Sequence, residues 1–294
     1  MSGALAHVGP NLPQDLLLAT GRHTGVLVFD PDAPTPRADA WLESKFAPWA
    51  RSIVQAWADG QYDELAQVLF SRADDSAQRL YYYICELQRR GLLAGPEPLI
   101  LDIAKIPRES SAERTVDAVR ALASRLGVTR EDLSASIAIC DRERATPALS
   151  LAGRVCLLAG SPPPDRRLHD AITAAGFAAC GPTLAEAWTE PGPAVGAGDD
   201  PFASIGRQLH RLARGPRAFV DAGAALEREA MAASAQAVVL WQIEEDEAQA
   251  WHLPAQRAAL ARAGVPALVL TRRDWLALDG AGDEIGAFLR GIEP

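Results

Sequence analysis

Short apolar runs alternate along the chain with longer segments in which apolar residues recur every three or four positions. The short runs are typical of buried strands, and the longer segments are typical of amphipathic helices. Their alternation indicates βαβ units around a largely parallel sheet, so an α/β fold is predicted. In the first half, we expect strands at residues 25–29, 67–70 and 98–103, and helices at 14–20, 38–59, 76–90 and 112–126. In the second half, we expect strands at 154–159, 177–180, 237–241 and 267–270, and helices at 165–175, 202–212, 223–234, 248–263 and 283–290.

A domain boundary is expected near residue 150. Residues 130–149 have the pattern of a connecting helix that bends or ends near Pro147, because proline lacks the N–H that a helix needs there. We therefore expect an N-terminal α/β lobe with helical additions at 1–150 and a C-terminal α/β lobe at 151–294. Each is predicted to be a doubly wound, Rossmann-like lobe with a parallel sheet. The Gly- and Pro-rich residues 181–201 are predicted to form a loop.

The length and net charge of the chain limit the kinds of molecule that it is expected to bind. The chain has 294 residues, 48% of them hydrophobic, which is enough to bury two cores of ordinary size. Its net charge of −9 is spread over the whole length, which argues against nucleic acid or an anionic membrane as the main partner. A small acyl ligand or another protein fits better. No apolar run approaches the ~20 residues of a membrane helix, and no leader precedes the first lobe, so we expect a cytoplasmic protein.

The common chemical motifs are missing from the sequence. Four cysteines, at Cys85, Cys140, Cys156 and Cys180, form no CxxC pair and are expected to be reduced and buried. The five histidines show no metal-ligand spacing. There is no GxGxxG, GxxxxGK[ST] or GxSxG motif. The segment LAGSPPPDRRLHD has the outline of a strand–loop–helix phosphate site, but its three consecutive prolines remove the backbone donors that such a loop needs.

The segment SRADDSAQRLYYYICELQRRG, residues 71–91, allows two interpretations. Asp74 or Asp75 can cap the helix that follows, and Leu80 with Cys85 or Leu87 can face the core, which makes it a buried and well-capped helix. Alternatively, the segment lies where open α/β sheets bind ligands, at the carboxyl end of a strand and the start of a helix. In that case the polar side chains that point into a cleft are Arg72, Asp74, Asp75, Gln78 and Arg79.

Two further segments combine a structural and a functional interpretation. In residues 41–57, Trp49, Ile53 and Trp57 lie on one helical face, which favours a core or subunit interface, while Arg51 near the helix start could hold an anion. Pro48 marks a break in this helix or its first turn. In residues 244–247, four consecutive carboxylates are expected to form a solvated helix start rather than a metal site, with Trp251 and His252 packed nearby.

Taken together, five segments resemble the 2-hydroxyacyl-CoA dehydratase and benzoyl-CoA reductase family. They are LPQDLLLATG, KFAPWARS, GQYDELAQVLFSRADDSAQRLYYYICELQ, PLILDIAKIPRESS and AGVPALVLTRRDW, and their order and spacing cover almost the whole chain. The resemblance implies two related subunits, each with two α/β lobes, and a 4Fe–4S cluster held by cysteines at the lobe interface. It also implies an ATP-driven activator that supplies an electron for radical chemistry on an acyl-CoA.

The resemblance fails at the cluster ligands. The Cys-Pro-aromatic motif of the family corresponds to Ala47-Pro48-Trp49, and its Cys-Asp pair falls on Ala73-Asp74 or Asp74-Asp75. Its third cysteine falls in residues 243–246, and its late Arg-x-x-Ala-Phe motif reads Glu284-Ile285-Gly286-Ala287-Phe288. Without thiolates the chain is expected to bind no metal and no cofactor of its own.

Three hypotheses follow. The first is a cluster-free family member that is either the partner of a cluster-bearing paralogous subunit in a hetero-oligomer or an acyl-CoA binder. The second is an active dehydratase or reductase component whose cluster is held by oxygen ligands or by the other chain, and the third is an unrelated two-lobe α/β binding protein. For acyl-CoA, the side chains expected at its phosphates or carboxylate, or at the same helix start, are Arg51, Arg72, Asp74, Asp75, Gln78, Arg79 and Arg108. No catalytic residue is assigned.

Overall fold

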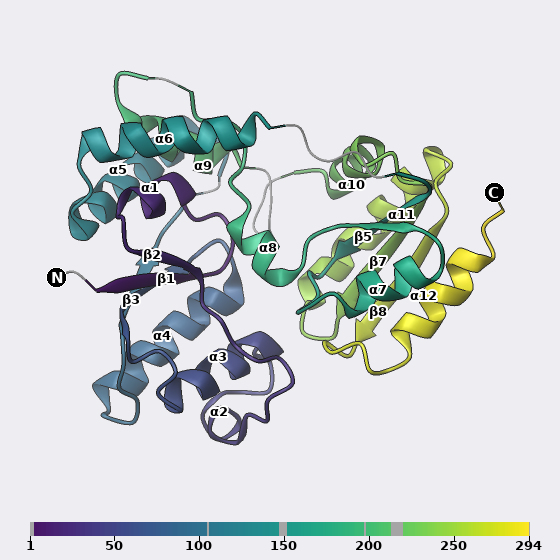
Figure 1. The fold of residues 1–294 in the computed structure, drawn as a ribbon, viewed down its shortest axis with the longest axis horizontal. Helices are drawn as coiled ribbons and strands as arrows, with labels where there is room; N and C mark the ends of the chain where they lie inside the picture. Colours follow the sequence, from purple (N-terminus) through teal and green to yellow (C-terminus); the bar gives the residue numbers. More distant parts are fainter. Residues whose placement is uncertain (1–2, 105, 147–151, 197, 213–219, 294) are drawn as a thin grey trace. The chain divides into compact units, whose positions relative to one another are not determined.

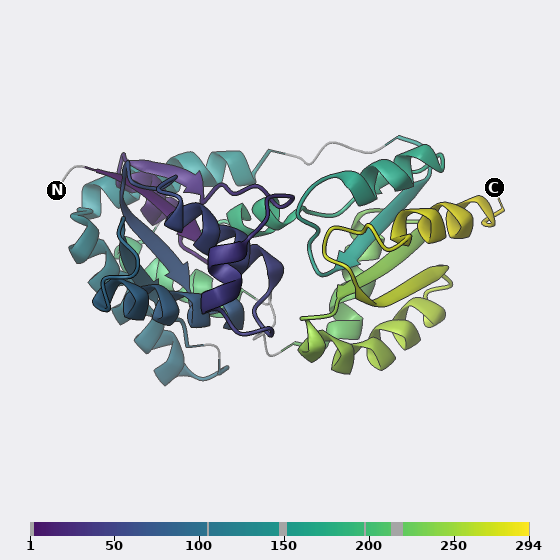
Figure 2. The same cartoon turned by 90° about the horizontal axis from the view of Figure 1, so that it is seen from below.

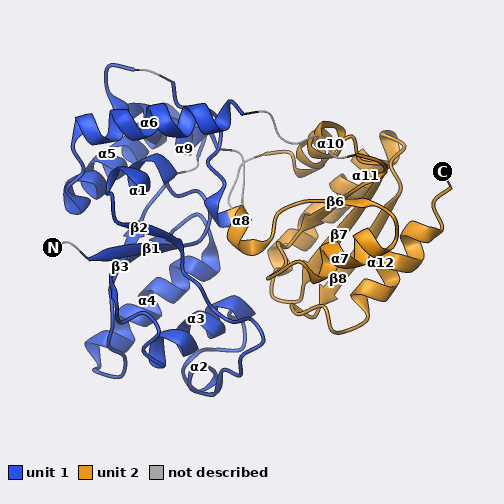
Figure 3. Cartoon of the chain, viewed as in Figure 1, with its two compact units in different colours: residues 1–148, 188–219 blue, residues 149–187, 220–294 orange. Residues whose placement is uncertain are grey.

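The structure, a computed structural model, describes residues 3–104, 106–146, 152–196, 198–212 and 220–293. It forms two compact units, each an α/β sandwich with a four-stranded, all-parallel sheet (Figure 3). The predicted fold class is therefore confirmed. Unit 1 comprises Met1–Ala148 and Trp188–Phe219, and unit 2 comprises Leu149–Ala187 and Val220–Pro294. The chain passes from unit 1 to unit 2 close to the expected boundary. It then returns to unit 1 at Trp188 and does not remain in one continuous second lobe.

The sheet of unit 1 has the order β2-β1-β3-β4. Its strands are β1 (Ala4–Val8), β2 (His23–Val26), β3 (Leu65–Ser71) and β4 (Glu97–Leu101). The central strand β1 was not predicted, and β2 begins before the expected strand at 25–29 because His23 pairs with Leu5. The chain runs from β1 to β2 on one side and continues with β3 on the other side of β1, so the switch point lies between β1 and β3.

Helices cover both faces of this sheet (Figure 1). They are α1 (Gln14–Ala19), α2 (Pro36–Trp41), α3 (Pro48–Ala58), α4 (Asp75–Arg89), α5 (Glu109–Leu126), α6 (Arg130–Arg144) and α9 (Pro201–Arg211). Helices α3 and α4 lie on one face, and α1, α5, α6 and α9 lie on the other. The helix expected over 38–59 is in fact two helices, and Pro48 occupies the first turn of the second, where its missing N–H costs nothing.

The hydrophobic stripe of α3 belongs to the core of unit 1. Trp49, Ile53 and Trp57 are at most 5% exposed, which confirms the core interpretation. The Trp57 ring lies edge to face with Tyr62, and its indole N–H donates to the carbonyl of Ala94 at 2.7 Å. A buried tryptophan needs such an acceptor, because an unpaired N–H in the core costs free energy.

Helix α9 explains why the returning segment belongs to unit 1. Its Ile205 and Leu209 are buried in the same core cluster as Leu5 of β1 and Leu101 of β4. Gly206 allows this close approach, because a Cβ at that position would lie 2.6 Å from the Cα of Val116 in α5. The apolar face of α9 is therefore satisfied by unit 1.

Unit 2 repeats the same topology with the strand order β6-β5-β7-β8. Its strands are β5 (Val155–Gly160), β6 (Ala178–Cys180), β7 (Ala237–Ile243) and β8 (Ala267–Arg273), and its helices are α7 (Arg167–Ala174), α10 (Ala222–Ala232), α11 (Leu253–Arg262) and α12 (Ala281–Arg290). Helices α7 and α12 pack together, as do α10 and α11 (Figure 2). The helix expected over 248–263 begins instead as the 3-10 helix η1 (Glu247–His252).

The predicted loop at 181–201 contains the short helix α8 (Leu184–Thr189), and its remaining described residues are irregular. The connecting helix expected over 130–149 is α6, which ends at Arg144; Pro147 lies outside the described residues. Across the described ranges, no helix combines the length and the apolar character needed to cross a membrane.

Candidate functional site

The carboxyl edge of the unit 1 sheet contains the start of α4. Gly9, just after β1, has φ +94°, and a Cβ there would lie 2.9 Å from the Cβ of Ser71 and 3.1 Å from that of Ala77. The turn after β1 is therefore pressed against the end of β3 and the first turn of α4. This is the switch point at which doubly wound sheets bind ligands.

Helix α4 is capped as its sequence predicts. The Asp74 carboxylate accepts a hydrogen bond from the backbone N–H of Ala77 at 2.7 Å. Asp75 is exposed in the first turn. Leu80 and Leu87 are buried, whereas Cys85 is only partly buried. The helix dipole favours both carboxylates at this end, and their negative charge opposes an anionic ligand.

Gln78, the third predicted site residue at this helix start, differs from Asp74 and Asp75. Its side-chain oxygen is buried, and no donor among the described residues reaches it. The side-chain oxygen of Gln78 can only accept a hydrogen bond. It therefore suits a ligand group that donates one, such as an N–H or O–H, better than a phosphate.

Arg51 and Arg79 come together around Glu43, in the loop between α2 and α3. One guanidinium nitrogen of Arg51 donates to the Glu43 carbonyl at 2.6 Å, and Arg79 lies 3.3 Å from the Glu43 carboxylate. Tyr83 donates to the same carboxylate at 2.9 Å, and this bond raises the pKa of the tyrosine. The Arg79 guanidinium lies 4.3 Å from the ring centre of Phe46. Sequence reasoning missed Glu43, because nothing in its local pattern indicates contacts with α4.

Arg72 and Arg108 lie elsewhere on the same edge. Arg72, which follows β3, forms an ion pair with Asp102, which follows β4. Asp102 also accepts from Arg114 of α5 at 3.2 Å. Arg108, just before α5, donates to the hydroxyl of Ser111 at 3.4 Å. The structure therefore distributes the predicted arginines over two clusters and an isolated position, and most of them already contact a carboxylate.

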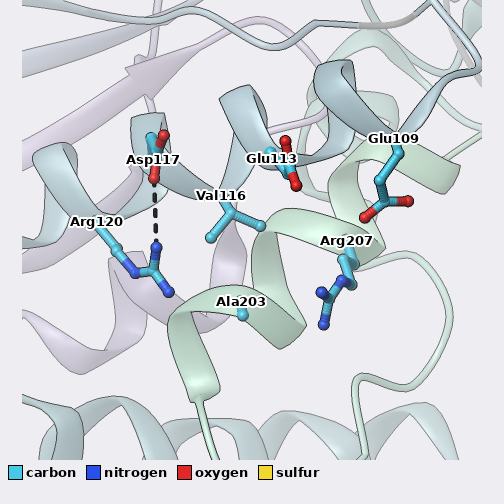
Figure 4. A pocket seen from close by; sticks show the side chains of 7 residues that line it. All are labelled: Glu109, Glu113, Val116, Asp117, Arg120, Ala203 and Arg207. Carbon is cyan, nitrogen blue, oxygen red and sulfur yellow. Dashed lines mark hydrogen bonds and ion pairs between the residues drawn. The ribbon is translucent and has the colours of Figure 1, made fainter.

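A groove of 310 Å³ lies between α5 and α9 (Figure 4). Arg120 closes one end through contacts with Asp117 at 3.3 Å and Asp200 at 2.6 Å. The residues that line it are Glu109, Glu113, Val116, Asp117, Arg120, Ala203 and Arg207. The four-residue spacing of the α5 carboxylates is visible in the sequence, but their meeting with α9 is not, because these helices are far apart along the chain.

The switch point of unit 2 contains a serine–aspartate pair. Ser161, just after β5, donates to the carboxylate of Asp246 and accepts from the backbone N–H of Ile243 at 3.2 Å. Burial raises the pKa of Asp246, and the hydrogen bond from Ser161 partly offsets this rise. Gly160 has φ +104°, and a Cβ there would lie 2.2 Å from the carbonyl oxygen of Trp241.

The acidic run at 244–247 was expected to form a solvated helix start. Glu244 and Glu247 are exposed, but Asp246 is not, because it turns inward to Ser161. Trp251, which was expected to pack nearby, is 87% exposed.

The four cysteines are free thiols. The predicted burial is confirmed for Cys140 and Cys156, whereas Cys85 and Cys180 are partly exposed. Burial raises the pKa of Cys140 and of Cys156 to about 12, which makes both poor thiolate ligands at neutral pH. Within the described ranges, no three His, Cys, Asp or Glu side chains converge as metal ligands would.

The resemblance places the first two family cysteines at Ala47 and at Ala73 or Asp74, all of which lie in unit 1. Ala47 precedes α3 and Ala73 precedes α4, and they are 3% and 2% exposed. Phe46 contacts Tyr83 edge to face, with ring centres 5.0 Å apart, so the segment before α3 packs against the body of α4. An alanine methyl cannot bind iron, and residues 243–246, where the third cysteine would fall, contain no cysteine, so the donor set does not fit a thiolate-held 4Fe–4S cluster. No known family model matches this chain, and no curated protein matches its sequence.

Proposed function

We propose that this chain is a cluster-free relative of the 2-hydroxyacyl-CoA dehydratase and benzoyl-CoA reductase family that acts as the partner of a 4Fe–4S-bearing paralogous subunit. The observation that carries the proposal is a pair of buried alanines, one in the segment before α3, which packs against α4, and one just before α4. The resemblance places the family cysteines at Ala47 and at Ala73 or Asp74, and both alanines are buried. Filling such positions with methyl groups keeps the packing of the scaffold and removes the ligands.

The fold supports the same proposal. Two parallel α/β units with added helices are what the family resemblance implies for one subunit. Doubly wound sheets serve many functions, and the pair of buried alanines is the feature that is specific to this proposal.

Binding of acyl-CoA by this chain alone would require its arginines to give up their present partners. Arg51, Arg72 and Arg79 already contact carboxylates, so a CoA phosphate would have to displace Asp39, Asp102 or Glu43. Among the predicted arginines, Arg108 has no carboxylate partner within the described residues. We therefore expect acyl-CoA to bind tightly only when the paralogue supplies further contacts.

Anaerobic purification with iron and acid-labile sulfide assays tests the cluster-free state. The chain should contain neither, whether it is produced alone or refolded with iron and sulfide. A stoichiometric brown cluster in the isolated chain would instead support the active component with non-cysteine ligands. The measurement does not depend on knowing the substrate.

Co-expression with a cysteine-bearing paralogue tests the partner role. A stable complex that binds acyl-CoA more tightly than either chain alone is expected. The variant Arg79→Ala should weaken that binding without unfolding the chain. Arg89→Ala on the same helix is the control, because Glu86, one turn away, is the carboxylate that Arg89 pairs with among the described residues. A chain that stays monomeric beside the paralogue and binds no CoA ester would favour an unrelated two-lobe α/β binding protein.

A further inference from the structure

The 3-10 helix η1 adds no side chain to the core of unit 2. None of its six residues is buried, and its largest side chain, Trp251, is 87% exposed. Five of the other tryptophans in the chain are at most 5% exposed. A tryptophan side chain covers about 150–250 Å² when it packs into a core or an interface. Trp251 therefore presents to solvent a surface of the kind that the chain elsewhere uses for packing.

A second large apolar side chain is exposed on the neighbouring loop. Leu278, between β8 and α12, is 72% exposed. Strands β7 and β8 are parallel neighbours, so η1 and this loop follow the same edge of the sheet. The backbone N–H of Glu244 donates to the carbonyl of Arg273 at 3.2 Å, and Arg272 donates to the Glu244 carboxylate at 3.0 Å. Both exposed side chains therefore belong to the carboxyl edge of unit 2, which is the edge where α/β units bind ligands.

The position of η1 is fixed by contacts with the strands. Asp246, the residue before η1, turns inward and accepts a hydrogen bond from Ser161, which is 4% exposed. The side-chain amide of Gln242 in β7 donates to the carbonyl of Gln249 in η1 at 3.3 Å. The buried Ser161–Asp246 pair thus anchors an otherwise exposed helix. A side chain that is held in place in this way loses less freedom when it binds, which favours Trp251 as a contact.

The carboxyl edge of unit 2 is acidic. Its carboxylates outnumber its two arginines, and they are Glu244, Glu247, Asp274, Asp279 and Glu284. Arg272 pairs with one of these carboxylates at 3.0 Å, and Arg273 is shared by two of them at 2.8 and 2.9 Å. The remaining negative charge attracts a cationic partner and repels nucleic acid and anionic lipid.

We propose that the carboxyl edge of unit 2 is a docking surface for a basic amphipathic segment of another protein, with Trp251 and Leu278 as its apolar anchors. Exposed aromatic side chains supply much of the binding energy in many protein interfaces. The excess of carboxylates selects lysine or arginine beside the apolar residues of the partner, because complementary charges favour encounter and like charges suppress it. The surface lies wholly in unit 2 and would bind such a segment whether or not the chain is a dehydratase relative.

Fluorescence anisotropy with labelled peptides and the full chain tests this surface. A helical peptide of leucine and lysine should bind. A peptide with glutamate in place of lysine, and one with serine in place of leucine, should each bind at least about tenfold more weakly. Added salt should also weaken binding, because it screens surface charges. The proposal fails if the leucine–lysine peptide does not bind, or if the serine–lysine peptide binds as well, since charge alone would then be sufficient.

Two pairs of variants locate the binding of the leucine–lysine peptide. Trp251→Ala should weaken it by about tenfold or more. Met231→Ala should leave it unchanged, because Met231, although 69% exposed, lies near the end of α10, which leads to the opposite edge of the same sheet. Glu247→Lys should weaken binding, whereas Glu64→Lys, at an exposed position before β3 in unit 1, changes the net charge equally and should not. Equal effects within either pair would overturn the proposal.

Measurements on the free chain separate other occupants of the surface. Sedimentation should show the same monomer for the wild type and for Trp251→Ala. The fluorescence that is lost in Trp251→Phe should be readily quenched by acrylamide in the wild type. A dimer that Trp251→Ala dissociates would mean that a second copy fills the surface, and a Trp251 shielded from acrylamide would mean that the chain covers it itself. Either result would overturn the proposal.

Discussion

The substitution Arg144→Met should destabilise unit 1 more than the loss of any other ion pair among the described residues would. The guanidinium donates to both oxygens of Asp15, at 2.8 and 2.6 Å, and the two side chains are 4% and 0% exposed. It also donates to Asp141 at 2.7 Å. In Arg144→Met, the Asp15 carboxylate would remain buried without its counter-ion.

The magnitude follows from the bonds that are lost. Two charge-assisted hydrogen bonds to Asp15 contribute about 1.5–3 kcal/mol each. Breaking a buried pair by removing one partner typically costs about 3–5 kcal/mol. We therefore expect the free energy of unfolding of unit 1 to fall by about 4 kcal/mol, a large part of the ~5–15 kcal/mol that stabilises an ordinary domain.

Urea unfolding at pH 7 measures this loss. Because the chain forms two compact units, we expect two unfolding transitions, and that of unit 2 should not move, which makes it an internal reference. Arg89→Met removes an exposed arginine from a pair with Glu86 on the surface of α4 and should leave both midpoints unchanged. The double variant Arg144→Met/Asp15→Leu should recover most of the loss, because an apolar pair replaces the ion pair.

Two results would refute the reasoning. One is a loss below about 1 kcal/mol in Arg144→Met, which is the range of a solvent-exposed pair. The other is a double variant as unstable as the single one, which would mean that the cost came from lost packing and not from an unpaired carboxylate.

Two smaller effects are also expected. Asp74→Ala should lower the stability of unit 1 by about 1 kcal/mol because the helix cap is lost, whereas Asp75→Ala should have a much smaller effect; equal losses in urea unfolding would show that the cap is not the cause. Gly160→Ala should destabilise unit 2 by more than the ~1 kcal/mol of an ordinary glycine replacement, because the new methyl would lie 2.2 Å from the Trp241 carbonyl oxygen; an unchanged melting temperature would contradict this.

The candidate site was predictable only where its signals are local. The cap at Asp74 and the buried face of α4 follow from the residues of one helix, and the structure has both. The clusters around Glu43 and Asp102 were not predictable, because their partners come from other elements. Asp246 was expected in solvent with its acidic neighbours, since the sequence does not reveal that Ser161 lies opposite it.

By itself, the sequence determined the α/β class, most helices and strands of the two units, and the break at Pro48. Hydrophobic periodicity, helix caps and proline each affect the backbone only within a few residues, so these features can be read from local sequence. Only the tertiary structure decided that the short segment around His7 is a central strand and that the chain returns to unit 1 at Trp188. Those features depend on buried polar contacts between residues far apart in the chain: His7 bonds a carbonyl 181 residues away, and Arg144 bonds Asp15 across 129 residues. A buried polar group is stable only beside its partner, and only folding brings the two together.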